Sequence, residues 1–142
     1  MLVDANVLLY ALLKNFPQHV RMREWLTLQL SQNQRIAVPW ASVLAFMRIA
    51  TNRRVLAVPL TSQQALQAMT ALIAHPNVWI AWPTPDHLRI FSELCDRHAA
   101  MGNMVMDLDI AALAMEHGLR VVSVDTDFAR FPESRWLNPL AT

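Results

Sequence analysis

The sequence is poor in glycine, lysine and cysteine, and each shortage excludes a class of site. The only glycines are Gly102 and Gly118, so no glycine-rich loop is present to cradle a phosphate. Lys14 is the only lysine, which leaves none late in the chain for a phospho-receiver site. The single cysteine, Cys95, excludes an internal disulfide, and its helical surroundings favour a packing role in a reducing cytoplasm over a nucleophilic one.

Charged residues are also scarce, at 16% of the chain against 54% apolar residues. The formal net charge of +1 predicts no general attraction to nucleic acid or membranes, so any RNA contact depends on local arginines. The five histidines lack metal-ligand spacing and are expected at the surface or in helix caps. No apolar run approaches the ~20 residues that span a bilayer, and the first residues lack the basic region of a secretory signal. We therefore expect a cytoplasmic protein without a membrane partner.

The order of apolar segments predicts a single domain over residues 1–142, large enough to bury roughly two-thirds of its unfolded surface. Short apolar runs alternate with longer amphipathic segments, which indicates βαβ units and a mainly parallel sheet covered on both faces. The predicted fold is a three-layer α/β/α sandwich. We expect strands at 1–4, 35–38, 78–82, 121–124 and briefly at 135–137, and helices at 6–13, 18–32, 40–51, 62–74, 86–99 and 107–117.

Several aspartates lie where these predicted elements begin or end. Asp4 and Asp125 each end a predicted buried strand, and Asp107 begins the helix that leads into the second of those strands. The carboxyl ends of parallel strands meet at one edge of a sheet, so these three side chains are expected to converge there. Asp127 is either a fourth member or the cap of a short helix. Asp109 points to another face of its helix and is expected to be a first-turn charge that favours the helix dipole.

Carboxylates that converge in a cleft repel one another unless a cation neutralises them. Hard oxygen ligands select Mg²⁺, or Mn²⁺, rather than zinc. Such a metal suits hydrolysis of a phosphodiester, because it activates water and stabilises charge on the phosphate oxygens. The alternative is that these acids are only caps and strand-end turns.

Three segments together resemble PIN-domain proteins, and among them the VapC toxins of bacterial toxin–antitoxin pairs: Leu2-Val-Asp-Ala-Asn-Val-Leu8, Asp107 to Ala114, and Val122-Ser-Val-Asp-Thr-Asp-Phe-Ala-Arg-Phe131. Pro39-Trp40, Arg48 and the ending Arg135 to Leu140 extend the similarity along nearly the whole chain. The resemblance implies a Mg²⁺-dependent endoribonuclease that cuts RNA, forms a homodimer and is held inactive by a cognate VapB-like antitoxin. It assigns catalysis and metal binding to Asp4, Asp107 and Asp125, with Asp127 as a weaker fourth ligand.

One position departs from the family pattern, because Ala45 stands where PIN domains commonly have a glutamate. A catalytically weak or inactive PIN-like binding module is therefore the alternative function, and a DNA nuclease is a third. Asn6 and Ser42 are candidates to hydrogen-bond the acids or metal waters, or else simple caps. Arg48, with Arg53 and Arg54, is expected to hold RNA phosphates or antitoxin carboxylates, or else to be a solvated helix end. The five tryptophans are expected in the core and interfaces rather than as base-stacking platforms.

Overall fold

The computed structural model describes residues 1–141 and has a central sheet of four parallel strands. The strand order is β3-β2-β1-β4, with β1 (Leu2–Val3) paired to both β2 (Ile36–Pro39) and β4 (Val121–Val122), and β3 (Val78–Ala81) beyond β2. The chain moves outward from β1 through β2 to β3 and then returns to the other side of β1. This reversal between β1 and β4 is a topological switch point, where open α/β sheets bind ligands beyond the carboxyl ends of their strands.

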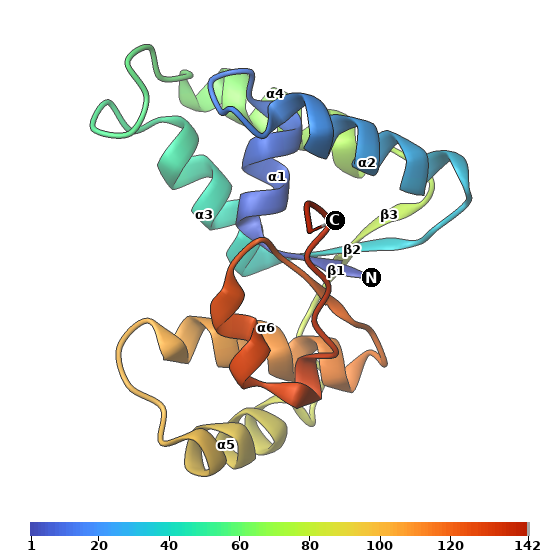
Figure 1. Cartoon of the computed structure of the whole chain (residues 1–142), viewed down its shortest axis with the longest axis vertical. Helices are drawn as coiled ribbons and strands as arrows, with labels where there is room; N and C mark the ends of the chain where they lie inside the picture. Colours follow the sequence, from blue (N-terminus) through green and yellow to red (C-terminus); the bar gives the residue numbers. More distant parts are fainter. Residues whose placement is uncertain (142) are drawn as a thin grey trace.

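Six α-helices cover the two faces of the sheet (Figure 1). Helices α1 to α4 lie on one side, and α5 and α6 lie on the other with the two short 3₁₀ helices η1 and η2. Their bounds are α1 Ala5–Leu12, α2 His19–Ser31, α3 Trp40–Ala50, α4 Ser62–Ile73, α5 His87–His98, α6 Met104–Glu116, η1 Thr126–Arg130 and η2 Pro132–Ser134. The predicted three-layer α/β/α sandwich is confirmed.

Neighbouring strand residues pack into opposite cores, as the twofold period of a strand requires. In β1, Val3 packs with the α1–α4 core and Leu2 with the α5–α6 core. In β4, Val122 and Val121 divide in the same way. Because both faces are covered, each of these strands is apolar throughout, which is typical of a parallel sheet.

Local sequence signals set several helix ends. Thr61 and Gln64 form a reciprocal capping box at the start of α4, with the Gln64 amide donating to the Thr61 hydroxyl at 3.1 Å. Gly118 follows the last turn of α6 with a φ of +67°, a left-handed conformation that glycine adopts without a Cβ clash. Among residues 1–141, no helix has both the length and the apolar character needed to cross a membrane.

Three predicted boundaries were wrong, the first being that β4 ends at Val122 and not at Val124, so Asp125 follows two residues after the strand. Helix α6 begins at Met104, one turn before the predicted start at Asp107, because the apolar residues Met104 to Met106 continue the helix toward Gly102. The predicted strand at 135–137 is reduced to one parallel bridge between Leu137 and Val122. Arg135 has a φ of +46°, which is incompatible with an extended strand at that residue.

Candidate metal centre

Asp4 lies at the junction of β1 and α1, where its extended backbone makes it the N-cap of the helix. Its Oδ1 accepts a hydrogen bond from the Ala5 amide at 2.7 Å, and its own amide donates to the Val122 carbonyl of β4 at 2.9 Å. The same residue therefore ends one strand, begins a helix and joins the neighbouring strand. This arrangement holds the carboxylate at the switch point.

Asn6 and Ser123 hold the other oxygen of Asp4. The Asn6 Nδ2 donates to Asp4 Oδ2 at 2.9 Å, and the Ser123 hydroxyl donates to that oxygen at 2.7 Å. The Ser123 hydroxyl in turn accepts from the Asp125 amide at 3.0 Å. A short network thus links Asp4 to the backbone of the segment that contains Asp125. Ser123 is fully buried, and it is the one contributor that the sequence analysis did not single out.

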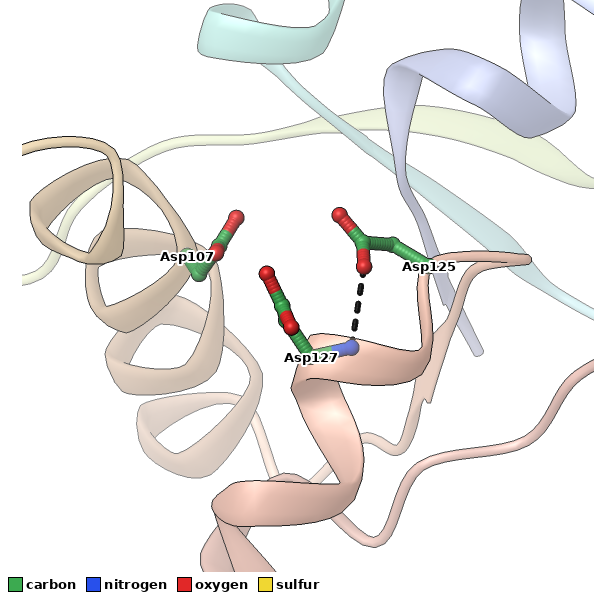
Figure 2. Close-up of side chains that lie close together, drawn as sticks. All are labelled: Asp107, Asp125 and Asp127. Atoms are coloured by element: carbon green, nitrogen blue, oxygen red, sulfur yellow. Dashed lines mark hydrogen bonds between the residues drawn. The ribbon is translucent and has the colours of Figure 1, made fainter.

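Asp107, Asp125 and Asp127 place carboxylate oxygens within 4.8 Å of one another (Figure 2). Asp107 comes from the first turn of α6, and the other two flank the start of η1. Asp125 is the N-cap of η1, and its Oδ1 accepts from the Asp127 amide at 2.9 Å. Within residues 1–141 this group of three excludes Asp4, which lies beside it. Asp127 is therefore inside the cluster. The capping role that was considered for Asp127 belongs to Asp125 instead.

The electrostatics of the site reflect this crowding. Burial, followed by the negative charges of Asp125, Asp4 and Asp127, raises the pKa of Asp107 to about 6 from an ordinary value of 3.8. Burial also raises the pKa of Asp4, against the opposing hydrogen bonds from Ser123 and Ala5. Both carboxyl groups are thus destabilised as anions, and a cation placed among them relieves that cost.

A cavity of about 130 Å³ adjoins the cluster between α1, α3 and α6. Asp4 and Asp107 line it together with Ser42, Ala45 and Arg48. Arg48 is exposed at its rim. Ala45 lies on the cavity wall, so the α3 side of the site offers a methyl group where the family resemblance implied a carboxylate.

Two roles were considered for Ser42, a contact to the acids or metal waters and a helix cap, and its hydrogen bond in the structure is neither a contact to an acid nor a cap. Its buried hydroxyl donates to the Val3 carbonyl at 3.2 Å, so its hydrogen bond goes to the backbone of β1 rather than to an acid. A buried carbonyl at the end of a two-residue strand needs a donor, and Ser42 is the one that α3 presents there. The side chain therefore fixes the packing of α3 against β1.

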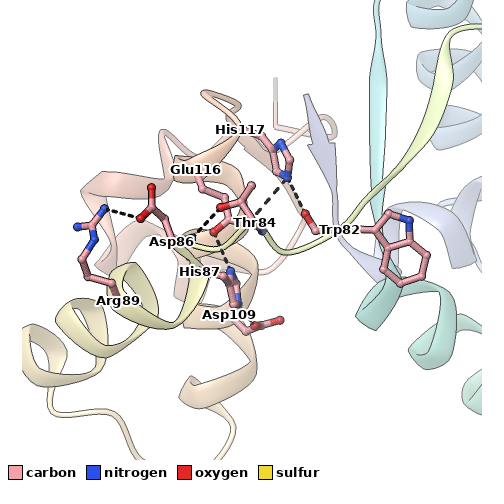
Figure 3. Close-up of polar contacts among 8 residues, drawn as sticks. All are labelled: Trp82, Thr84, Asp86, His87, Arg89, Asp109, Glu116 and His117. Carbon is pink, nitrogen blue, oxygen red and sulfur yellow. Dashed lines mark hydrogen bonds and ion pairs between the residues drawn. The ribbon is translucent and has the colours of Figure 1, made fainter.

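The prediction that Asp109 is a first-turn charge was wrong, because α6 begins five residues before it. Asp109 instead accepts from His87, with 2.7 Å between its Oδ1 and His87 Nε2 (Figure 3). The other ring nitrogen of His87 lies 2.9 Å from Glu116, whose side chain is only 2% exposed. Burial lowers the pKa of His87, but the hydrogen bonds that it donates to Asp109 and Glu116 outweigh this effect, and the net shift is upward. His87 thus joins two carboxylates of α6 and is not the surface or capping histidine that was expected.

The ligand atoms of this site suit a hard divalent cation. Carboxylate oxygens come from the starts of α1, α6 and η1, and neither histidine nor cysteine belongs to the cluster. Carboxylates with raised pKa values are the expected state of such a ligand set before a cation neutralises it.

Comparisons with known proteins agree with the fold. The PIN domain family model matches residues 1–134. Ribonuclease VapC31 of Mycobacterium tuberculosis is 39% identical over 141 residues, covering 97% of each chain, and ribonuclease VapC33 of the same organism is 36% identical over 137 residues, covering 96% of each.

Two solved structures have the same fold at low sequence identity. VapBC2 from Rickettsia felis, bound to a DNA fragment from its promoter, has a TM-score of 0.68 at 17% identity and covers 96% of both chains. VapBC-1 from nontypeable Haemophilus influenzae has a TM-score of 0.68 at 18% identity, covering 99% of this chain and 98% of that one. With four parallel strands, acids at the switch point and relatives above one-third identity along nearly their whole length, the chain belongs to the PIN-domain family, and ribonucleases named VapC are among its relatives.

Proposed function

We propose that this protein is a metal-dependent endoribonuclease toxin, which hydrolyses RNA phosphodiester bonds and is neutralised by a cognate VapB-like antitoxin. The observation that carries the proposal is the convergence of Asp107, Asp125 and Asp127, with Asp4 beside them, at the switch point of the sheet. Relatives that are themselves named ribonucleases support the reaction class. The cytoplasm is the proposed compartment, because RNA is available there and a lone cysteine suits a reducing environment.

Asp107, Asp125 and Asp127 would hold Mg²⁺, or Mn²⁺. Asp4 would be a further ligand, or would accept a hydrogen bond from a water bound to the ion. When bound, the ion activates water and offsets the charge that develops on the scissile phosphate. The chain itself supplies positioning. Ser123 and Asn6 hold the Asp4 carboxylate in one orientation, and the Asp127 amide does the same for Asp125.

Arg48 is the proposed contact for an RNA phosphate, because it is the basic residue at the rim of the cavity that Asp4 and Asp107 line. The same guanidinium is suited to an antitoxin carboxylate, which would then compete with RNA at the site. Homodimerisation is part of the proposal. Its support is the set of large apolar side chains that remain exposed, including Leu88 and Met106.

The test measures cleavage of a mixed RNA pool by purified protein with Mg²⁺, with Mn²⁺ and with a chelator. We expect metal-dependent cleavage that falls roughly 100-fold or more in Asp107→Asn. Asp86→Asn is the matched control, since Asp86 is an exposed aspartate paired with Arg89 outside the cluster. Mn²⁺ binding to each protein, followed by calorimetry, gives a second readout. Equal cleavage by Asp107→Asn and the wild type would refute the assignment of the site. A DNA pool is tested in parallel, and faster cleavage of DNA than of RNA would refute RNA as the substrate.

A binding module that acts only through partner complexes is the second candidate, and Ala45 on the cavity wall favours it. The site then lacks a carboxylate and holds its cation weakly. Purified protein that binds an antitoxin but leaves the RNA pool intact at saturating Mn²⁺ would establish this alternative. Robust cleavage that a chelator abolishes would exclude it.

A further inference from the structure

A second cleft lies next to the acidic cavity and shares Ala41 with it. This indole cleft has a volume of about 400 Å³, and its walls include Trp40, Leu44, Trp82, His87, Asp109 and Leu113. Its volume falls in the range of small-ligand sites. Asp107 lines the acidic cavity and Asp109, two residues later on another face of α6, lines the indole cleft.

The apolar wall of the indole cleft is an exposed aromatic pair. The rings of Trp40 and Trp82 stack with their centroids 5.5 Å apart and their planes at 29°. The two residues remain 44% and 56% exposed, so neither lies in the core, the first of the two places expected for the tryptophans. Exposed indoles of this kind provide a flat surface on which a nucleobase can stack.

The polar wall is small, because Asp109 supplies the one carboxylate among lining residues that are otherwise mostly apolar. His87 holds its Oδ1 at 2.7 Å, and Glu116 holds the other side of the imidazole ring at 2.9 Å. Figure 3 shows the Asp109 carboxylate pointing away from α5, on the side of the network where the Trp82 indole lies. Within the described residues, Oδ2 of Asp109 accepts no hydrogen bond, so it is available to a donor in the cleft.

We propose that the indole cleft binds a base of the RNA substrate beside the scissile phosphate, and that Asp109 selects a base bearing an amino group. This inference rests on the proposed ribonuclease function. Guanine, adenine and cytosine present N–H₂ donors to a carboxylate oxygen, whereas the one imino donor of uracil is flanked by two carbonyl oxygens that the carboxylate repels. Stacking on the indole pair supplies affinity, and the hydrogen bond to Asp109 supplies selectivity.

The carboxylate also distinguishes a base from a second copy of the chain as the occupant. An apolar side chain from another protomer would cover Trp40 and Trp82 but leave the charged Asp109 facing an apolar group, which is unfavourable. A base satisfies both walls at once. Because Ala41 lines both cavities, a base in the cleft would lie next to the acidic cavity.

The test compares Asp109→Asn and Trp82→Ala with two controls that do not line the cleft, Asp86→Asn and Leu66→Ala. Cleavage products of a randomised RNA pool are sequenced, and the base preference next to the cut is measured. We expect a wild-type preference for amino-bearing bases over uracil that falls about tenfold in Asp109→Asn, whose amide can donate to uracil carbonyls. Trp82→Ala should raise KM about tenfold with kcat changed less than twofold. The controls should match the wild type in both.

Three outcomes overturn the inference. One is an unchanged base preference in Asp109→Asn. Another is a Trp82→Ala variant that becomes monomeric in sedimentation while the base preference persists, because the face is then an interface between copies. If the wild type cuts no RNA, the ribonuclease proposal itself has failed. Base binding in the cleft is then tested separately, by measuring the affinities for GMP and UMP in a fluorescence titration. Equal affinity of the wild type for the two nucleotides then overturns the cleft assignment.

Discussion

Replacing Asp107 with asparagine should stabilise the metal-free protein while abolishing its stabilisation by metal. The pKa of Asp107 is raised from 3.8 to about 6 by burial and by three neighbouring carboxylates. In the pH window between these values the folded protein holds a proton that the unfolded chain has released. The free energy of unfolding therefore falls as pH rises through about 6, and the full penalty is present above it. Asparagine keeps the shape of the side chain and removes the charge.

The magnitude follows from the size of the shift. A change of about two pKa units corresponds to about 3 kcal/mol. Asp107 is only half-buried, so solvent screening reduces the expected gain to about 1 kcal/mol. For a chain of this length, that gain raises the Tm by roughly 3 °C. Saturation with Mn²⁺ at a hundred times its Kd stabilises the wild type by about 2.7 kcal/mol, which should reverse the order of the two proteins.

Thermal unfolding followed by calorimetry, at pH 7.5 and pH 5 with and without Mn²⁺, measures both effects. At pH 7.5 without metal, Asp107→Asn should melt above the wild type, and the gap should shrink at pH 5, where Asp107 is protonated. With Mn²⁺ the wild type should melt above the variant. Asp86→Asn, an exposed control, should stay within about 0.5 kcal/mol of the wild type throughout. A metal-free Asp107→Asn variant that is less stable than the wild type at pH 7.5 would show that the carboxylates do not repel one another as described.

Three further predictions concern the same site. The apparent affinity for Mn²⁺, measured by calorimetry, should fall about tenfold per pH unit below about 6, because protons compete for Asp107; a flat affinity down to pH 4.5 would contradict the assigned pKa. Ser123→Ala should lower the free energy of unfolding by about 1–3 kcal/mol in urea titrations, since it leaves the Asp125 amide without its buried acceptor, and an unchanged midpoint would show that the network is dispensable. Ala45→Glu adds a carboxylate to the cavity wall and should tighten Mn²⁺ binding by roughly tenfold, whereas weaker binding would mean that the Ala45 wall does not face the ion.

The layers of the fold were predictable because burial on both faces makes each parallel strand apolar throughout. Ile36 to Val38 and Val121 to Val122 show this pattern in a few residues. Helix ends were predictable where a local signal exists, as at Thr61 and Gly118. The start of α6 was missed because Asn103, although of a residue type that often caps helices, makes no capping hydrogen bond, and the helix simply continues through apolar residues. That one-turn error is the source of the wrong role for Asp109.

The sequence by itself determined that acids follow two buried strands, because the strand pattern and the position of a carboxylate after it are both local. Asp4 and Asp125 were identified in this way. Only the tertiary structure decided which carboxylates meet, since Asp4 and Ser123 are 119 positions apart and come together through the pairing of β1 with β4. The same packing placed Asp127 inside the cluster, directed Ser42 to a backbone carbonyl, and paired Asp109 with His87. Each of these outcomes depends on distances of a few ångströms between elements, and the spacing of residues along a chain does not contain them.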